Sequence, residues 1–287
     1  MKNRLAFLAL SSLLGPVPLA RADSLTIVAC APGYPGSTIE AQPTLDAFAA
    51  AVASVSGLGR GEILAAYFEN EAAGLERLAR PDAAFALVPL PFFLKHEKAL
   101  KLVAHAQALP QGGEATETWS LVAGKGRLAG AAALDGWELV SLAAYAPAFV
   151  RGSALGVWGK VPATTRLLAS GAVLSALRQA ATGERVAALL DSAQAAALDS
   201  LPFYQDLEVV TRSAPMPGVV FCTAAGRAGE VREHALLKAL LELAARPAGA
   251  AALSGLRLSA FEPVDEAGLA RARQGYAAAL DLARARP

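Results

Sequence analysis

The chain has 287 residues, of which 54% are hydrophobic and 18% charged, and its formal net charge is +1. This length suits one large domain or two ordinary ones, and the apolar fraction excludes a disordered chain. A net charge near zero does not favour the basic surface of a nucleic-acid-binding protein. Two cysteines are too few for a disulfide framework or a four-thiolate metal site. We therefore expect a globular protein without nucleic acid, metal or cofactor.

The first 22 residues have the layout of an export signal. Two basic residues precede a short apolar segment at 5–14, and Ala20-Arg21-Ala22 fits a small-x-small cleavage site. The apolar segment is shorter than the roughly 20 residues of a spanning helix. Cleavage after Ala22 would remove three basic residues and change the net charge from +1 to −2. We expect a periplasmic monomer that does not span the membrane.

Both cysteines lie in apolar segments that resemble strands. Residues 27–30 loosely fit a lipoprotein box, but Arg21 and Asp23 separate them from the apolar part of the signal. We therefore expect no lipid anchor at Cys30. A cysteine in such a segment usually behaves as a small hydrophobe, so we expect no essential bond between Cys30 and Cys222.

Strands and helices alternate after the signal. The expected strands are 25–29, 63–68, 84–88 and 101–106, with helices at 37–55, 71–79 and 91–100 between them. Ser37 and Glu40 fit a capping box at the start of the first helix, and Pro43 offers an alternative start. This alternation predicts a largely parallel sheet with crossover helices.

A strand at 118–123 leaves this layer and leads to a second alternating block. Its expected strands are 138–142, 164–168, 186–190 and 207–211, and its helices are 145–155, 173–181 and 193–200. A strand at 219–223 and two amphipathic helices, 230–245 and 265–285, follow. Two blocks joined by two extended crossings predict a two-lobed α/β fold with a hinge. The first lobe is expected to comprise 23–121 and 216–287, and the second 122–215.

The candidate ligand-binding residues lie mainly where strands lead into helices, because open α/β sheets bind ligands at that edge. They are Tyr34, Ser37 and Thr38 after the first strand, Trp119 in the first crossing, and Tyr145, Asp191 and Ser192 in the second block. A helix N-terminus beside them favours an anionic group. Each has a structural alternative, since Ser37 and Asp191 can simply cap helices and Trp119 can simply pack.

Signals for an enzyme are weak. The three histidines, His96, His105 and His234, lack metal-ligand spacing. The serine of 152–156 stands one position too early for a nucleophile elbow, and the glycine-rich segment 124–130 is one residue too long for a dinucleotide fingerprint. We therefore expect a binding protein with no catalytic residues.

Several phrases carry a family resemblance: "YPGSTIEAQPTLDAFAAAV" (34–52), "PDAAFALVPLPFFLKH" (81–96) and "SALRQAATGERVAALLDSAQAAAL" (175–198). They resemble the type II periplasmic substrate-binding proteins of ABC transporters, closest to the phosphate/phosphite/phosphonate-binding branch. The resemblance implies two lobes that close on a small polar or anionic ligand. It also implies an ABC transporter permease as the partner that recognises the closed form.

One segment departs from this family. The phosphonate binders carry a Ser/Thr-rich anion clamp at the start of a second-lobe helix, and the matching residues 143–148 read AAYAPA. Asp191 would also repel a bare dianion. We expect a small polar ligand with an acidic end, for which phosphonate is the nearest family example. An exported enzyme and a ligand-free sensory or accessory protein on the same fold stay open as alternatives.

Overall fold

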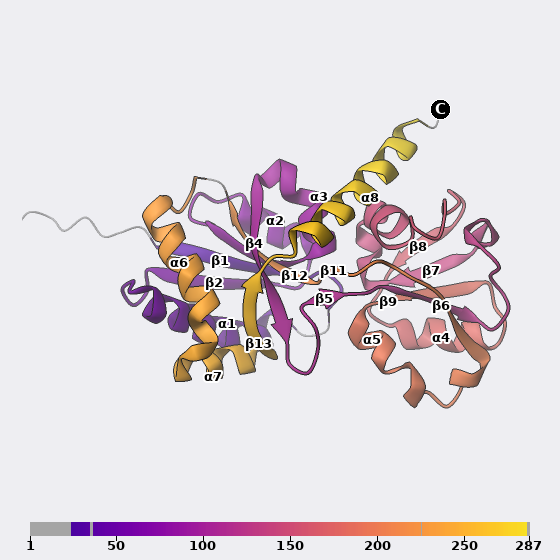
Figure 1. Ribbon diagram of the computed structural model, residues 1–287, viewed down its shortest axis with the longest axis horizontal. Coiled ribbons are helices and arrows are strands. Elements are labelled where there is room, and N and C mark those ends of the chain that lie inside the picture. Colours follow the sequence, from indigo (N-terminus) through magenta and orange to yellow (C-terminus); the bar gives the residue numbers. More distant parts are fainter. Residues whose placement is uncertain (1–23, 35–36, 225, 286–287) are drawn as a thin grey trace, which may run out of the picture.

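The computed structural model describes residues 24–34, 37–224 and 226–285. Figure 1 shows two α/β lobes side by side, with the first lobe carrying β1 to β4 and the second carrying β6 to β10. The expected export signal at 1–22 lies outside the described residues.

The first lobe is built on a six-stranded sheet of order β13-β4-β12-β3-β1-β2. Its strands are β1 (Leu25–Cys30), β2 (Ile63–Phe68), β3 (Phe85–Pro89), β4 (Leu102–Pro110), β12 (Val219–Ala224) and β13 (Leu258–Pro263). The first four run in one direction, and β12 and β13 run against them. Every residue of β1 and β3 is buried, as expected for apolar strands covered on both faces.

Helices cover both faces of this sheet. They are α1 (Thr38–Ser56), α2 (Glu71–Leu78), α3 (Leu90–Leu100), α6 (Glu230–Glu242) and α7 (Pro247–Gly255). Alternate side chains of β1 enter different layers: Ile27 packs with α1, α6 and α7, whereas Val28 packs with α2 and α3. The capping box expected at the start of α1 is present, so α1 begins at Thr38 and Pro43 lies inside it.

The second lobe is built on a five-stranded sheet of order β10-β6-β9-β7-β8. Its elements are β6 (Ser120–Gly124), β7 (Glu138–Ser141), β8 (Arg166–Ala169), α4 (Val173–Ala181), β9 (Val186–Leu190), α5 (Ser192–Ala196) and β10 (Leu207–Arg212). Only β6 runs against the other strands that the structure describes in this sheet. The sheet begins at Ser120, two residues before the expected lobe boundary at 122.

Two short strands cross between the lobes as an antiparallel pair. They are β5 (Thr116–Glu117) and β11 (Met216–Pro217), and Met216 stands opposite Glu117. The last helix, α8 (Glu266–Arg284), reaches from the first lobe across to the second (Figure 1). There the Ser153 hydroxyl donates to the Ala272 carbonyl at 2.7 Å, so α8 fastens the lobes together at a third place.

The structure differs from the expected elements most in two regions, while the helix expected over 193–200 is shortened to α5 and a 3-10 turn at Leu198–Ser200. Instead of one helix over 145–155, it has a 3-10 turn at Leu142–Tyr145 and a π-helix at Phe149–Ala154. Pro147 lies between them and has no backbone N–H to continue a helical ladder. In the second region, α7 and β13 occupy a stretch for which the sequence predicted no element. Glycines dilute the helical pattern of α7, and β13 is a short edge strand that ends in proline.

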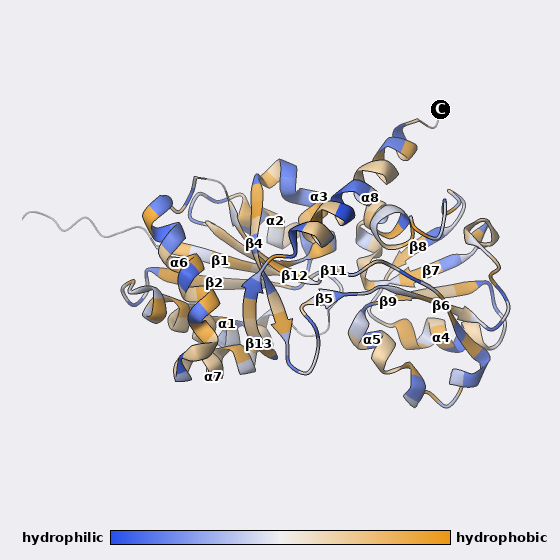
Figure 2. Ribbon diagram, viewed as in Figure 1, coloured by the Kyte–Doolittle hydropathy of each residue, from blue (hydrophilic) through white to orange (hydrophobic). Residues whose placement is uncertain are grey.

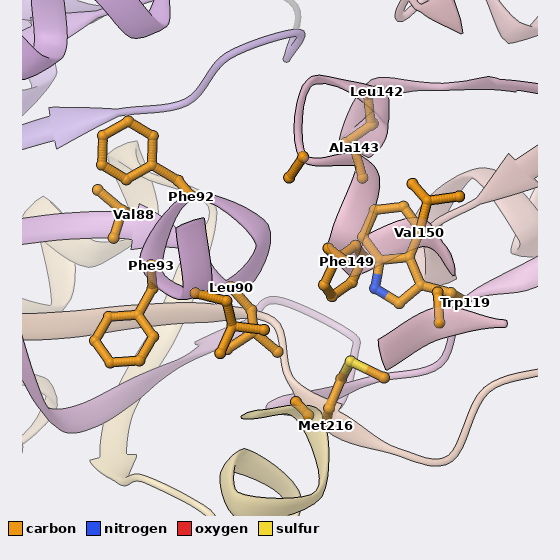
Figure 3. Close-up of a cluster of buried hydrophobic side chains, with 14 of the residues drawn as sticks. Val88, Leu90, Phe92, Phe93, Trp119, Leu142, Ala143, Phe149, Val150 and Met216 are labelled. Atoms are coloured by element: carbon orange, nitrogen blue, oxygen red, sulfur yellow. The ribbon is translucent and has the colours of Figure 1, made fainter. Parts of the chain in front are cut away.

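Apolar side chains fill much of the junction between the lobes (Figure 3). Val88, Leu90, Phe92 and Phe93 come from the first lobe, Trp119, Leu142, Ala143, Phe149 and Val150 from the second, and Met216 from the return crossing. In Figure 2 hydrophilic residues stand out on outward-facing helices and loops, including α8. Cys30 and Cys222 are both free and fully buried.

Candidate ligand-binding site

Four polar side chains from separate segments meet at the lobe junction. Tyr34 follows β1, Glu117 lies in β5, Tyr145 ends the 3-10 turn after β7, and Asp191 follows β9. Burial raises the pKa of Tyr34 well above its usual value, and the nearby Glu117, Asp191 and Tyr145 raise it further. Tyr34 therefore lies within electrostatic range of Glu117, Tyr145 and Asp191. All of these residues except Glu117 were candidates named from the sequence.

Glu117 is the member that the sequence analysis missed. Burial, with a smaller contribution from Asp191, raises the pKa of Glu117 to about 8, and the backbone amide of Ser192 opposes this shift. Glu117 is therefore mostly protonated at neutral pH. From the sequence, the Glu117 carboxyl next to the polar loop 111–116 is expected to face solvent. The pairing of β5 with β11 brings it into the junction instead.

Asp191 caps α5, so its structural alternative is realised. Its Oδ1 accepts from the Gln194 backbone N–H at 2.7 Å, and the Gln194 Oε1 accepts from the Asp191 N–H at 3.2 Å. Burial nevertheless raises the pKa of Asp191, against the effect of the amides of Gln194 and Ala193. The cap thus holds a buried carboxyl, 4% exposed, at a fixed place beside Tyr34.

The serine and threonine candidates are engaged in local structure. The Ser192 hydroxyl accepts from the Thr118 N–H at 3.0 Å, which ties α5 to the first crossing. The Ser37 N–H and hydroxyl donate to the Glu40 carboxylate at 3.1 and 3.0 Å, and the Thr38 N–H donates to Glu69 at 3.2 Å. An anion at the α1 N-terminus would therefore have to displace the chain's own carboxylates.

Trp119 and Tyr145 carry polar atoms that are buried without a partner. Trp119 is fully buried and packs edge to face on Phe149, with ring centroids 5.2 Å apart (Figure 3). Among the residues that the structure describes, neither the Trp119 Nε1 nor the Tyr145 Oη has a hydrogen-bond partner. Leaving such a buried group without a partner costs about 1–3 kcal/mol.

Lys95 on α3 ties the two lobes together at Tyr145. Its Nζ donates to the Tyr145 carbonyl at 2.7 Å and to the Glu71 carboxylate at 2.9 Å, and it lies 5.6 Å from the centre of the Tyr145 ring. The His96 Nε2 lies 2.7 Å from the other Glu71 oxygen. Burial alone would raise the pKa of Glu71, but the hydrogen bonds from Lys95 and His96 outweigh it and lower that pKa.

A cavity of about 600 Å³ adjoins Tyr34 on the first lobe. Its lining includes Ala29, Leu87 and Pro89 at the ends of β1 and β3, the rings of Tyr34 and Tyr67, and the polar residues Glu40, Thr44 and Arg257. The volume is in the range of small-molecule sites, and the position at the carboxyl ends of parallel strands is where α/β sheets bind ligands. Tyr34 belongs both to this cavity and to the buried cluster.

Two kinds of feature are absent from the described part of the chain. No three His, Cys, Asp or Glu side chains there are placed to hold a metal ion. Likewise, no helix within 24–34, 37–224 and 226–285 is long and apolar enough to cross a membrane.

No protein-family model and no curated protein sequence matches this chain, but solved structures do. XAC2383 from Xanthomonas citri, solved with chloride and with ATP, has a TM-score of 0.69 and 17% and 18% identity, over 90% of this chain and 99% of its own. A binding protein component of an ABC phosphonate transporter from Pseudomonas aeruginosa has a TM-score of 0.63 and 15% identity, over 91% and 89%. PhnD1 from Prochlorococcus marinus, in complex with methylphosphonate, has a TM-score of 0.58 and 13% identity, over 89% and 98%.

At these identities the likeness establishes the fold, and it extends over nearly all of the compared chains. The chain has the two-lobed α/β fold of the type II periplasmic binding proteins.

Proposed function

We propose that this protein is a periplasmic solute-binding protein that captures a small polar ligand between its lobes for an ABC transporter permease. The observation that carries the proposal is the convergence at the lobe junction of the loop with Tyr34, the crossing with Glu117 and the start of α5 with Asp191, where Gly33 approaches Leu142 and the Ser192 hydroxyl accepts from the Thr118 N–H. The fold and the cavity of about 600 Å³ beside Tyr34 support it. Binding and release need only differential contacts in two lobe arrangements, so the protein requires no reaction of its own.

The carboxyl groups of Glu117 and Asp191 restrict the ligand. An anionic group facing the Asp191 carboxylate would be repelled, whereas a hydroxyl or ammonium group would donate to the oxygens of either carboxyl group. We therefore propose a ligand with a donor group at the carboxyl side and its acidic group turned away from it. Phosphonates belong in the test because PhnD1 is solved with methylphosphonate.

Melting temperature and calorimetric titration of the purified protein test this function. The solutes are methylphosphonate, 2-aminoethylphosphonate, phosphate, β-alanine and ethanolamine. A binder at a 100-fold excess over its Kd stabilises the folded state by about 2.7 kcal/mol, and the melting temperature rises with concentration. Saturable binding of one solute supports the proposal, and no binding of any of them contradicts it.

Two variants then locate the site. Tyr34→Phe and Asp191→Asn should each weaken binding of the solute found, because each alters a polar group of the cluster while the asparagine can still cap α5. Asp265→Asn is the matched control, since Asp265 caps α8 through the Gly268 N–H at 3.0 Å. Unchanged affinity in both cluster variants would move the site elsewhere.

A further inference from the structure

Arg257 stands in an unusual backbone conformation at the edge of the cavity. It follows the end of α7 and has φ of 57°, in the left-handed region that favours glycine. Among the described residues other than glycine, only Lys101 shares a positive φ. A glycine would meet the same backbone requirement at lower cost, so the arginine side chain is not explained by the turn.

The backbone around Arg257 is fixed without help from its side chain. The Arg257 N–H donates to the Ser254 carbonyl at 2.9 Å, and the Gln111 N–H donates to the Arg257 carbonyl at 2.9 Å. The Gln111 Nε2 also donates to the Ser254 hydroxyl at 3.2 Å. Within the part of the chain that the structure describes, the Arg257 guanidinium makes no hydrogen bond or ion pair. Its positive charge is therefore available to the cavity that it lines.

The carboxylate that lines the same cavity is already committed. Glu40 accepts from both the N–H and the hydroxyl of Ser37, and these hydrogen bonds lower its pKa. No ion pair joins it to Arg257. The rings of Tyr34 and Tyr67 and several apolar side chains line the same cavity. The cavity thus combines an uncommitted cation with surfaces suited to a short hydrocarbon body.

We propose that Arg257 binds the anionic end of the ligand, whose hydrocarbon part lies against Tyr34 and Tyr67 and whose donor group faces Glu117 and Asp191. The ligand class is a small molecule that carries a carboxylate or phosphonate at one end and an ammonium or hydroxyl group at the other. A guanidinium binds either anion through two parallel hydrogen bonds, a role that the missing Ser/Thr clamp would otherwise fill. This inference rests on the proposed function and deepens it.

Arg257→Gly is the decisive variant because its effects on stability and on binding have opposite signs. Glycine relieves the left-handed backbone, so the melting temperature of the empty protein should rise. Affinity for 2-aminoethylphosphonate or β-alanine, whichever binds the wild type, should fall about 10- to 100-fold through loss of a charged hydrogen-bond donor. Comparing these two solutes decides between phosphonate and carboxylate.

Lys101→Gly is the matched control, since Lys101 also follows a helix in the left-handed region but lies outside the cavity. It should raise the melting temperature similarly and leave affinity unchanged. Arg257→Lys, which keeps the charge and loses the planar fork, should bind with intermediate affinity.

The outcomes separate this inference from the proposed function. An anionic solute that binds the wild type and Arg257→Gly equally overturns the role of Arg257 and leaves the function standing. Binding of ethanolamine alone does the same. If none of the solutes binds the wild type, the proposed function fails and the role of Arg257 fails with it.

Discussion

The two tyrosines at the lobe junction have opposite surroundings. Tyr34 lines an open cavity of about 600 Å³ and lies near two carboxyl groups. Tyr145 is held by Lys95 across the lobes, and its hydroxyl is buried without a partner among the described residues. Tyr145 also packs against the apolar cluster that contains Trp119 and Phe149. We call the Tyr145 side, which contacts between the lobes close, the sealed side of the junction, and the Tyr34 side, which borders the cavity, the open side.

On the sealed side, we expect the largest loss of stability from a substitution where α8 crosses the π-helix. A Cβ at Gly152 would overlap the Gly275 carbonyl and lie 2.9 Å from the Ala279 methyl. Gly152→Val should lower the free energy of unfolding by about 3 kcal/mol, because neither backbone can move away without unpacking α8. Urea denaturation measures this loss.

Gly130→Val is its control, since a Cβ at Gly130 meets nothing within 4 Å and its φ of 177° is open to any residue. Equal stability of the two variants would show that the crossing is not tightly packed.

On the open side, we expect the Glu117 carboxyl to make the free energy of unfolding depend on pH. The pKa of Glu117 is about 8 in the folded state, against 4.5 when unperturbed, so the folded chain binds more protons than the unfolded chain between these values. Its contribution to stability is complete below pH 4.5 and is lost as pH rises through 8. We expect a loss of about 2 kcal/mol between pH 5 and pH 8, below the limit of about 1.4 kcal/mol per pH unit because water reaches the carboxyl in part.

Glu117→Gln should remove most of this slope while other titrating groups keep theirs, and urea denaturation at several pH values measures it. Glu114→Gln, in the exposed loop just before β5, provides the comparison. A slope that survives in Glu117→Gln contradicts the assignment.

Lys95→Met tests the contact that joins the two lobes at Tyr145. The variant loses the hydrogen bond to the Tyr145 carbonyl and the ion pair with Glu71, which together should cost about 1–2 kcal/mol and favour separated lobes. The radius of gyration from X-ray scattering should therefore increase. Lys98→Met, at an exposed position on the same helix, should change neither quantity. If the two variants behave alike, Lys95 does not fasten the lobes.

Several elements and candidate site residues could be predicted from the sequence. The bounds of α4 and β9 are as predicted, because α4 is amphipathic and β9 is a short apolar run between turns. Tyr34, Tyr145 and Asp191 were correctly placed after strands, and the edge rule for α/β sheets brings them near one another.

Other features depend on contacts that no local pattern contains. Glu117 is half-buried at the junction because β5 pairs with β11, a strand almost a hundred residues later. The surroundings of Arg257 are set by residues from β1, β3 and α1. The π-helix at Phe149–Ala154 has to fit against α8, whose close approach at Gly275 cannot be inferred from the segment itself. Tertiary contacts thus decide the parts of the site that composition and periodicity leave open.

The place of β12 in the first sheet has a consequence for the order in which the lobes fold. Strands β3 and β4 both pair with β12, so the middle of that sheet lacks a strand until residues 219–224 have emerged and can join it. The second sheet, by contrast, is drawn from the continuous segment 120–212. Domains generally fold as units while the chain emerges from its N-terminus. The lobe that begins second in the chain is therefore the one able to finish folding first, and the nascent first lobe has to wait for its returning strand.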